Sequence, residues 1–153
     1  MSTVPTLNGQ VIGQAHYATR ALLEQAVAPL GVEFHQLLAL NVLANGPVDR
    51  AQLTQRITTT LKVDESAVHQ VVDRLVDAGL AQVEGPSAAN GGDGPQVALT
   101  DTGRATQRSV AAAVADLSAR LYADIPADEA GTAARVLTLV TERANAELAA
   151  IPA

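Results

Sequence analysis

The sequence predicts a mainly α-helical fold with one small β-hairpin. Six stretches place small or apolar residues every three or four positions, which is the period of an amphipathic helix. Two short stretches, at 80–84 and 96–99, instead alternate with the period of a β-strand. The connection between them, residues 85–95, is rich in Gly, Asn, Ser and Pro, so we expect it to project into solvent as a loop.

The first two helices are expected at about 7–29 and 33–45. Pro29 and Gly31 end the first, and Gly46 with the proline after it ends the second, because neither residue type continues a helix well. The expected buried side of the second helix consists of Phe34, Leu37, Leu38 and Val42.

The third and fourth helices lie directly before the hairpin. Asp49 is a favourable N-cap for the third, which repeats leucine or isoleucine at every fourth position. The fourth spans about 65–78, is capped by Asp64 or Ser66, and ends at Gly79. Its apolar stripe is the clearest in the chain and consists of Val68, Val71, Val72 and Leu75.

Two long helices are expected after the hairpin. Thr100 caps one that runs to Tyr122, and Pro126 lies in the first turn of the last. The last helix carries a long apolar stripe: Ala130, Ala134, Leu137, Val140, Ala144, Leu148 and Ile151. A core of this size cannot cover the stripes of both terminal regions, which favours a symmetric homodimer.

The order of elements predicts a winged helix-turn-helix core at 32–100, with the wing at 85–95. Residues 1–31 and 101–153 form the expected helical dimerisation region. A length of 153 residues suits this one cooperative unit better than two independent domains.

The composition excludes several other classes of protein. The chain has no cysteine, which removes disulfides and cysteine-ligated zinc, and its three aromatic residues argue against a single-stranded nucleic-acid binder that stacks bases. Its net charge of −6 argues against a general polyanion binder. We find no signal-peptide pattern and no apolar run of membrane-spanning length, so we expect a soluble, cytoplasmic protein.

Two motifs carry a resemblance to a known family. SAVHQVVDRLVDAGL at 66–80, followed by VALTDTGR at 97–104, resembles the MarR family of bacterial transcriptional regulators, over nearly the whole chain. The resemblance implies a homodimer that binds a palindromic operator in double-stranded DNA through two recognition helices. It also implies regulation, often repression, that a small phenolic or oxidant ligand relieves.

The helix at 65–78 is the expected recognition helix. Its polar face offers Ser66, Ala67, His69 and Gln70 to base edges. Gln70 has the paired donor and acceptor that read adenine, Ser66 suits a base or a phosphate, and Ala67 suits a thymine methyl group. The alternative is that these residues are only the solvated face of an amphipathic helix.

Arg56, Lys62 and Arg74 are the expected contacts to the DNA backbone. The segment 58–63 is about four residues longer than the family's usual spacing, so the third helix is expected to gain one turn that moves Arg56 and Lys62 toward phosphates. Arg74 follows Asp73 as in the family, where it would hold a phosphate or brace the wing. A local ion pair between the two is the alternative.

The wing departs from the family pattern. Its expected tip is Asn90, Gly91, Gly92 and Asp93, but Pro95 stands where the family has an arginine. Between 33 and 99 there are four cations and eight anions, so we expect modest affinity for DNA and a shallow salt dependence. The acidic surface also supports another hypothesis, a winged-helix dimer that has lost DNA affinity and binds a partner protein instead.

A ligand pocket is expected near the first two helices. His16, Tyr17, His35 and Leu38 would surround a phenolic or carboxylate effector, although the histidines are also interpreted as ordinary helix-surface residues. The three histidines are too scattered for a metal site. The sequence contains no catalytic motif and no cofactor motif, so we expect no enzyme activity and no cofactor.

Overall fold

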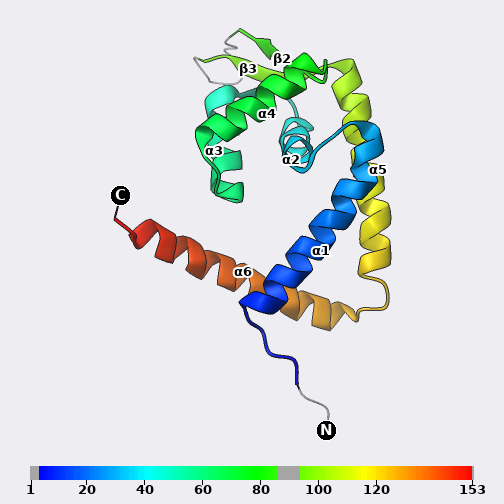
Figure 1. Ribbon diagram of the computed structural model, residues 1–153, viewed down its shortest axis with the longest axis vertical. Coiled ribbons are helices and arrows are strands. Elements are labelled where there is room, and N and C mark those ends of the chain that lie inside the picture. The colour runs from blue at the N-terminus through cyan, green and yellow to red at the C-terminus, as the bar shows by residue number, and fades with distance from the viewer. Residues whose placement is uncertain (1–3, 86–93, 153) are drawn as a thin grey trace. The chain divides into compact units, whose positions relative to one another are not determined.

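The computed structural model describes residues 4–85 and 94–152 and confirms the predicted mainly helical fold (Figure 1). These residues form six α-helices, a short 3-10 helix and three strands. They are α1 (Gly9–Val27), η1 (Ala28–Leu30), α2 (Phe34–Leu43), β1 (Val48–Asp49), α3 (Arg50–Leu61), α4 (Glu65–Asp77), β2 (Ala81–Glu84), β3 (Gln96–Leu99), α5 (Asp101–Leu121) and α6 (Ala127–Ala150). The chain divides into two compact units, Met1–Leu117 and Ser118–Ala153.

The sheet has one strand more than the hairpin that the sequence predicts. β3 lies between β1 and β2 and is antiparallel to both. β1 pairs through Val48 with Val97 and through Asp49 with Gln96, and the N–H of Arg50 continues the ladder by donating to the Pro95 carbonyl at 2.9 Å. Two residues are too few to show an alternating pattern, so β1 could not be recognised in the sequence.

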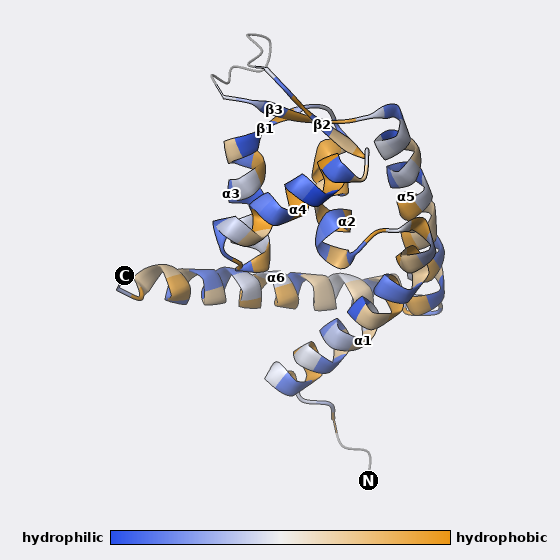
Figure 2. Ribbon diagram, turned by 45° about the horizontal axis from the view of Figure 1, so that its top comes forward, coloured by the Kyte–Doolittle hydropathy of each residue, from blue (hydrophilic) through white to orange (hydrophobic). Residues whose placement is uncertain are grey.

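The core of the first unit lies among α2, α3, α4 and the sheet. α4 packs against both α2 and α3, and it buries the four residues of its predicted stripe. Figure 2 shows the hydrophilic residues of α4 along its other side. The expected buried side of α2 was partly wrong: Leu37 is buried, whereas Phe34, Leu38 and Val42 are only half-buried. Leu40 and Leu43 are fully buried instead, because the apolar residues of α2 are spread around the whole helix and do not mark its inward face.

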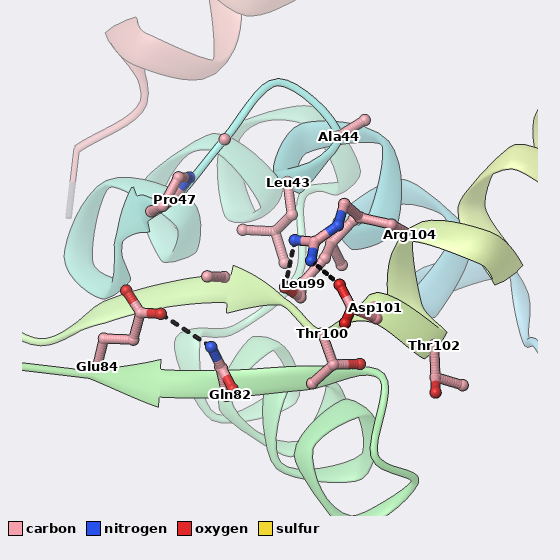
Figure 3. A pocket seen from close by; sticks show the side chains of 12 residues that line it. Leu43, Ala44, Pro47, Gln82, Glu84, Leu99, Thr100, Asp101, Thr102 and Arg104 are labelled. Carbon is pink, nitrogen blue, oxygen red and sulfur yellow. Dashed lines mark hydrogen bonds and ion pairs between the residues drawn. The ribbon is translucent and has the colours of Figure 1, made fainter.

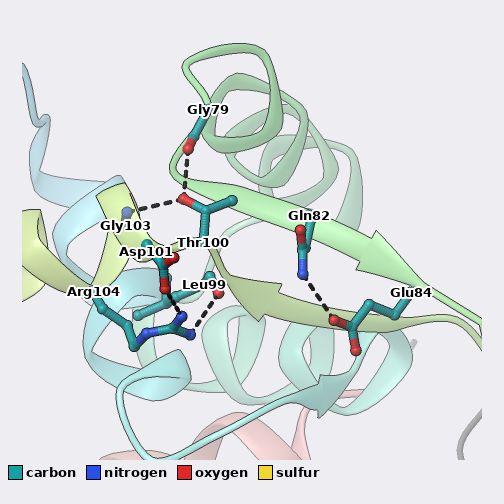
Figure 4. A network of polar contacts seen from close by, with 8 residues as sticks. All are labelled: Gly79, Gln82, Glu84, Leu99, Thr100, Asp101, Gly103 and Arg104. Atoms are coloured by element: carbon teal, nitrogen blue, oxygen red, sulfur yellow. Dashed lines mark hydrogen bonds and ion pairs between the residues drawn. The ribbon is translucent and has the colours of Figure 1, made fainter.

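The residues before α5 join it to the hairpin (Figure 4). The Thr100 hydroxyl caps α5 by accepting from the Gly103 N–H at 3.0 Å, and it donates to the Gly79 carbonyl at 2.6 Å. Arg104 donates to the Leu99 carbonyl at 3.0 Å and pairs with Asp101. The LTDTGR motif is therefore a structural junction between α4, the sheet and α5.

The terminal helices expose many apolar side chains. On α6 the exposed large residues are Leu137, Leu139, Val140 and Leu148, and Ile151 follows the helix. The N-terminal region similarly exposes Leu7, Val11, Tyr17 and Leu22. In the described parts of the chain no single helix is long and apolar enough to cross a membrane, and one helix pair bent by 75°, Gly9–Leu30 with Phe34–Leu43, passes that test on length and composition together.

Candidate nucleic-acid interface

The side of α4 opposite the core carries the four predicted base-contacting residues. Ser66 and Gln70 are exposed, and Ala67 and His69 are half-buried. Asp64 is the N-cap residue, although its side chain makes no capping hydrogen bond. Because Val68, Val71, Val72 and Leu75 fix the helix against the core, its polar face is held in one orientation on the first unit.

Arg50 connects the start of α3 to this face. Its Nε donates to His69 Nδ1 at 3.4 Å, and its Nη2 donates to Asp73 Oδ1 at 3.1 Å. The Arg50 side chain is 23% exposed and that of Asp73 is 65% exposed. Sequence analysis missed Arg50 as a site residue, because its partners lie 19 and 23 positions further along the chain.

Arg74 takes a partner other than its neighbour Asp73. It pairs with Glu33, the N-cap residue of α2, at 3.3 Å, and both side chains are mostly exposed. The alternative of a local pair between Asp73 and Arg74 is wrong, since Asp73 pairs with Arg50. An exposed pair of this kind contributes only about 0.5 kcal/mol, so a phosphate could displace Glu33 at little cost.

Arg56 lies on α3, which ends at Leu61, and Lys62 is the C-cap residue that follows this helix. Arg56 is exposed on the helix surface. Lys62 ends the helix in the left-handed conformation with φ of 59°, and its ammonium donates to the Thr59 carbonyl. Both side chains are on the surface of the same unit as α4.

The predicted wing tip, Asn90 to Asp93, lies outside the described residues. At the described base of the hairpin, Gln82 donates to Glu84 at 2.8 Å on β2. A hollow of about 620 Å³ lies beside this base (Figure 3). Its one arginine, Arg104, is already bonded to Leu99 and Asp101, so the hollow offers little attraction to an anion.

Two of the four predicted ligand residues, His35 and Leu38, line hollows in the described part of the chain, and the two hollows are different. His16 and Tyr17 are exposed on α1, with ring centroids 5.5 Å apart. His35 lines a hollow of about 410 Å³ between α1 and α2, together with Arg20 and Phe34. Leu38 lines a separate hollow, between α2 and α3.

The hollow that contains Leu38 measures about 600 Å³ and lies between α2 and α3. Its lining is mainly apolar and includes Val42, Ile57 and Leu61, with Arg56 as its one charged residue. Among residues 4–85 and 94–152, no group of three or more histidine and carboxylate side chains could hold a metal ion.

No protein-family model matches the sequence, and no curated protein matches it. Solved structures do match. An oxidised form of MarR from E. coli is 26% identical with a TM-score of 0.67, over 91% of this chain and 96% of that one. A mutant MarR from E. coli complexed with operator DNA is 25% identical with a TM-score of 0.72, over 86% of this chain and 91% of that one.

The chain has the MarR-family fold. CouR from Rhodococcus jostii RHA1, solved with bound p-coumaroyl-CoA, has the same fold at 18% identity, with a TM-score of 0.74 over 87% of this chain and 90% of that one. In this MarR-type fold α2, α3, α4 and the sheet form the winged helix-turn-helix, and α4 is the last of its three helices before the hairpin.

Proposed function

We propose that this chain is a DNA-binding transcriptional regulator that acts as a homodimer and responds to a small ligand. The observation that carries the proposal is the polar face of α4, which the buried stripe on the other side of the helix holds outward. A structure with the same fold has been solved on operator DNA, and it is 25% identical over 86% of this chain. The solved structures that share the fold of this chain are regulators, which supports a protein without enzyme activity.

In this proposal α4 enters the major groove and reads base edges. Exposed Ser66 and Gln70 are one helical turn apart, so both reach the same groove floor. Gln70 would bind adenine through a donor and an acceptor, Ala67 would contact a thymine methyl group, and His69 would add one further base contact.

The backbone contacts proposed are Arg56, Lys62 and Arg74. They lie on two adjacent helices of the winged unit, and each is exposed. Phosphate would replace Glu33 as the partner of Arg74, and the Thr59 carbonyl as the partner of Lys62. The wing tip, Asn90 to Asp93, would contact the minor groove with no cation of its own.

The homodimer would form through the terminal helices. Leu137, Val140 and Leu148 recur along one face of α6, and a monomer in water would leave them all hydrated. A two-fold axis pairs such a face with its own copy, and it sets two recognition helices on the two halves of a palindrome.

The effector proposed is a phenol or carboxylate with an apolar body. The hollow between α2 and α3 suits its body, and Arg56 supplies a cation for its charge. Since α3 packs on α4, a ligand there would act on the recognition helix directly. A structure with this fold has been solved with p-coumaroyl-CoA, which is consistent with a bound small molecule.

A second candidate is a protein-interaction module. Two of the four cations between 33 and 99, Arg50 and Arg74, are paired with carboxylates, and the net charge is −6. A basic partner protein would suit such a surface better than DNA does.

Fluorescence anisotropy of the purified protein with the duplex upstream of its coding region separates the two candidates. Titration at low and at high salt should give specific binding about a thousandfold tighter than to random DNA. Binding to neither duplex at low salt would contradict the regulator, and copurification of a basic protein would then support the interaction module.

A further inference from the structure

The Arg50 guanidinium donates two hydrogen bonds to side chains on one turn of the recognition helix. His69 and Asp73 are four residues apart and so lie on the same face of α4. The guanidinium donates from Nε to His69 Nδ1 and from Nη2 to Asp73 Oδ1, which are the two parallel N–H groups of its planar fork. Each contact constrains the geometry of the other.

The contact with His69 decides which ring nitrogen carries the proton. A neutral imidazole has one N–H donor and one acceptor nitrogen. Arg50 is a permanent cation with no acceptor, so Nδ1 must be the acceptor. The remaining nitrogen, Nε2, therefore carries the hydrogen and is a donor.

The backbone of Arg50 is itself held firmly. Its N–H donates to the Pro95 carbonyl at 2.9 Å, and its carbonyl accepts from the Thr54 hydroxyl at 2.8 Å. It is also the first residue of α3, directly after the N-cap Asp49. The guanidinium therefore starts from a fixed position between the sheet and α3.

We propose that Arg50 is a positioning residue that holds His69 in its Nε2–H form, so that His69 presents a hydrogen-bond donor to the DNA base edge. This inference rests on the proposed function. A donor selects guanine O6 or N7, adenine N7 or thymine O4, and it disfavours the amino group of cytosine. Arg50 also neutralises Asp73, whose carboxylate would otherwise repel the DNA.

Nuclear magnetic resonance tests the proton assignment without DNA. Long-range proton–nitrogen correlations of ring-labelled histidine distinguish the two neutral forms, and the variant His69→Asn identifies the signals of His69 among the three histidines. The spectra are recorded at about pH 8.5, roughly two units above the ordinary histidine pKa. We expect the Nε2–H form alone in the wild-type protein and a mixture of both forms in Arg50→Met.

Arg20→Met is the control, because it removes a cation of α1 that is paired with Glu24 and is not among the proposed DNA contacts, so it should leave the His69 signals unchanged. Circular dichroism checks that both variants fold. A wild-type spectrum of the Nδ1–H form, or an Arg50→Met spectrum identical to the wild type, would overturn the assignment.

Selection from a randomised duplex library tests the role in DNA reading. We expect Arg50→Met to lose roughly fivefold or more of its base preference at one position per half-site, while Arg20→Met keeps the full motif. An unchanged Arg50→Met motif would overturn the reading role while leaving the regulator intact. If the wild-type protein enriches no sequence, the proposed function fails, and the reading role fails with it, whatever the spectra show.

Discussion

Gly103 lies against the backbone of Leu80: a Cβ at position 103 would stand 1.8 Å from the Leu80 carbonyl oxygen and 2.8 Å from its carbon. That same oxygen accepts a hydrogen bond from the Thr100 N–H at 3.0 Å. The first turn of α5 therefore packs directly on the backbone at the entrance to β2. The glycine of the LTDTGR motif is required by space, since its φ is not in the left-handed region.

Gly103→Ala should destabilise the protein strongly. The methyl group would collide with backbone atoms, which cannot move aside as a flexible side chain does, so we expect a loss of about 3 kcal/mol in the free energy of unfolding. Urea unfolding followed by circular dichroism measures it. Gly131→Ala is the control, because Gly131 is inside α6 with no heavy atom near its Cβ position, and alanine there should stabilise by up to about 1 kcal/mol. Equal stability of Gly103→Ala and the wild type would contradict the close approach.

Gln70→Ala should weaken binding to the preferred operator by about 1–3 kcal/mol and change binding to random DNA little. The reason is that its amide would contact a base edge, whereas random DNA is held mainly through phosphates. Gln25→Ala, at an exposed position of α1, is the control and should bind like the wild type. Equal losses on operator and random duplexes would show that Gln70 does not read bases.

Arg56→Ala should make DNA binding less sensitive to salt. Each phosphate contact contributes about 0.9 to the slope of log K against log salt concentration, so a dimer that loses two contacts should lose about 2 from the slope. Anisotropy titrations over a salt series measure it, with Arg20→Ala on α1 as the comparison, since Arg20 is already paired with Glu24. An unchanged slope would place Arg56 away from the DNA.

Leu148→Glu should convert a dimer to monomers. Leu148 is 52% exposed on the apolar stripe of α6, where a charge would be buried against the partner copy. Analytical ultracentrifugation gives the mass. Ala146→Glu introduces the same charge on the opposite side of the helix, near Arg135 and Glu142, and should remain dimeric. A wild-type protein that sediments as a monomer would contradict the dimer itself.

The sequence predicted those features that depend on local periodicity. The stripe from Val68 to Leu75 correctly located α4 and its buried side, and Asp49 was correctly expected to cap α3. The winged helix-turn-helix followed from the order of these elements. Such signals lie within one helix, so no tertiary information is needed to find them.

The features that could not be predicted depend on contacts between distant residues. Nothing near Arg50 indicates that it meets His69 and Asp73 on another helix. Likewise, nothing in the sequence around His35 and Leu38 indicates that they line different hollows, because each hollow is formed together with a second helix, α1 for His35 and α3 for Leu38.

The three-stranded sheet also affects how the protein avoids aggregation through its strand edges. Its central strand, β3, has both of its edges occupied, which leaves β1 and β2 as the outer strands. Exposed strand edges invite pairing with other chains, and short or charged edges discourage it. β1 has only two residues, and β2 ends in the exposed carboxylate of Glu84. The hairpin thus presents a poor template for amyloid-like growth, even with the apolar Val83 exposed on β2.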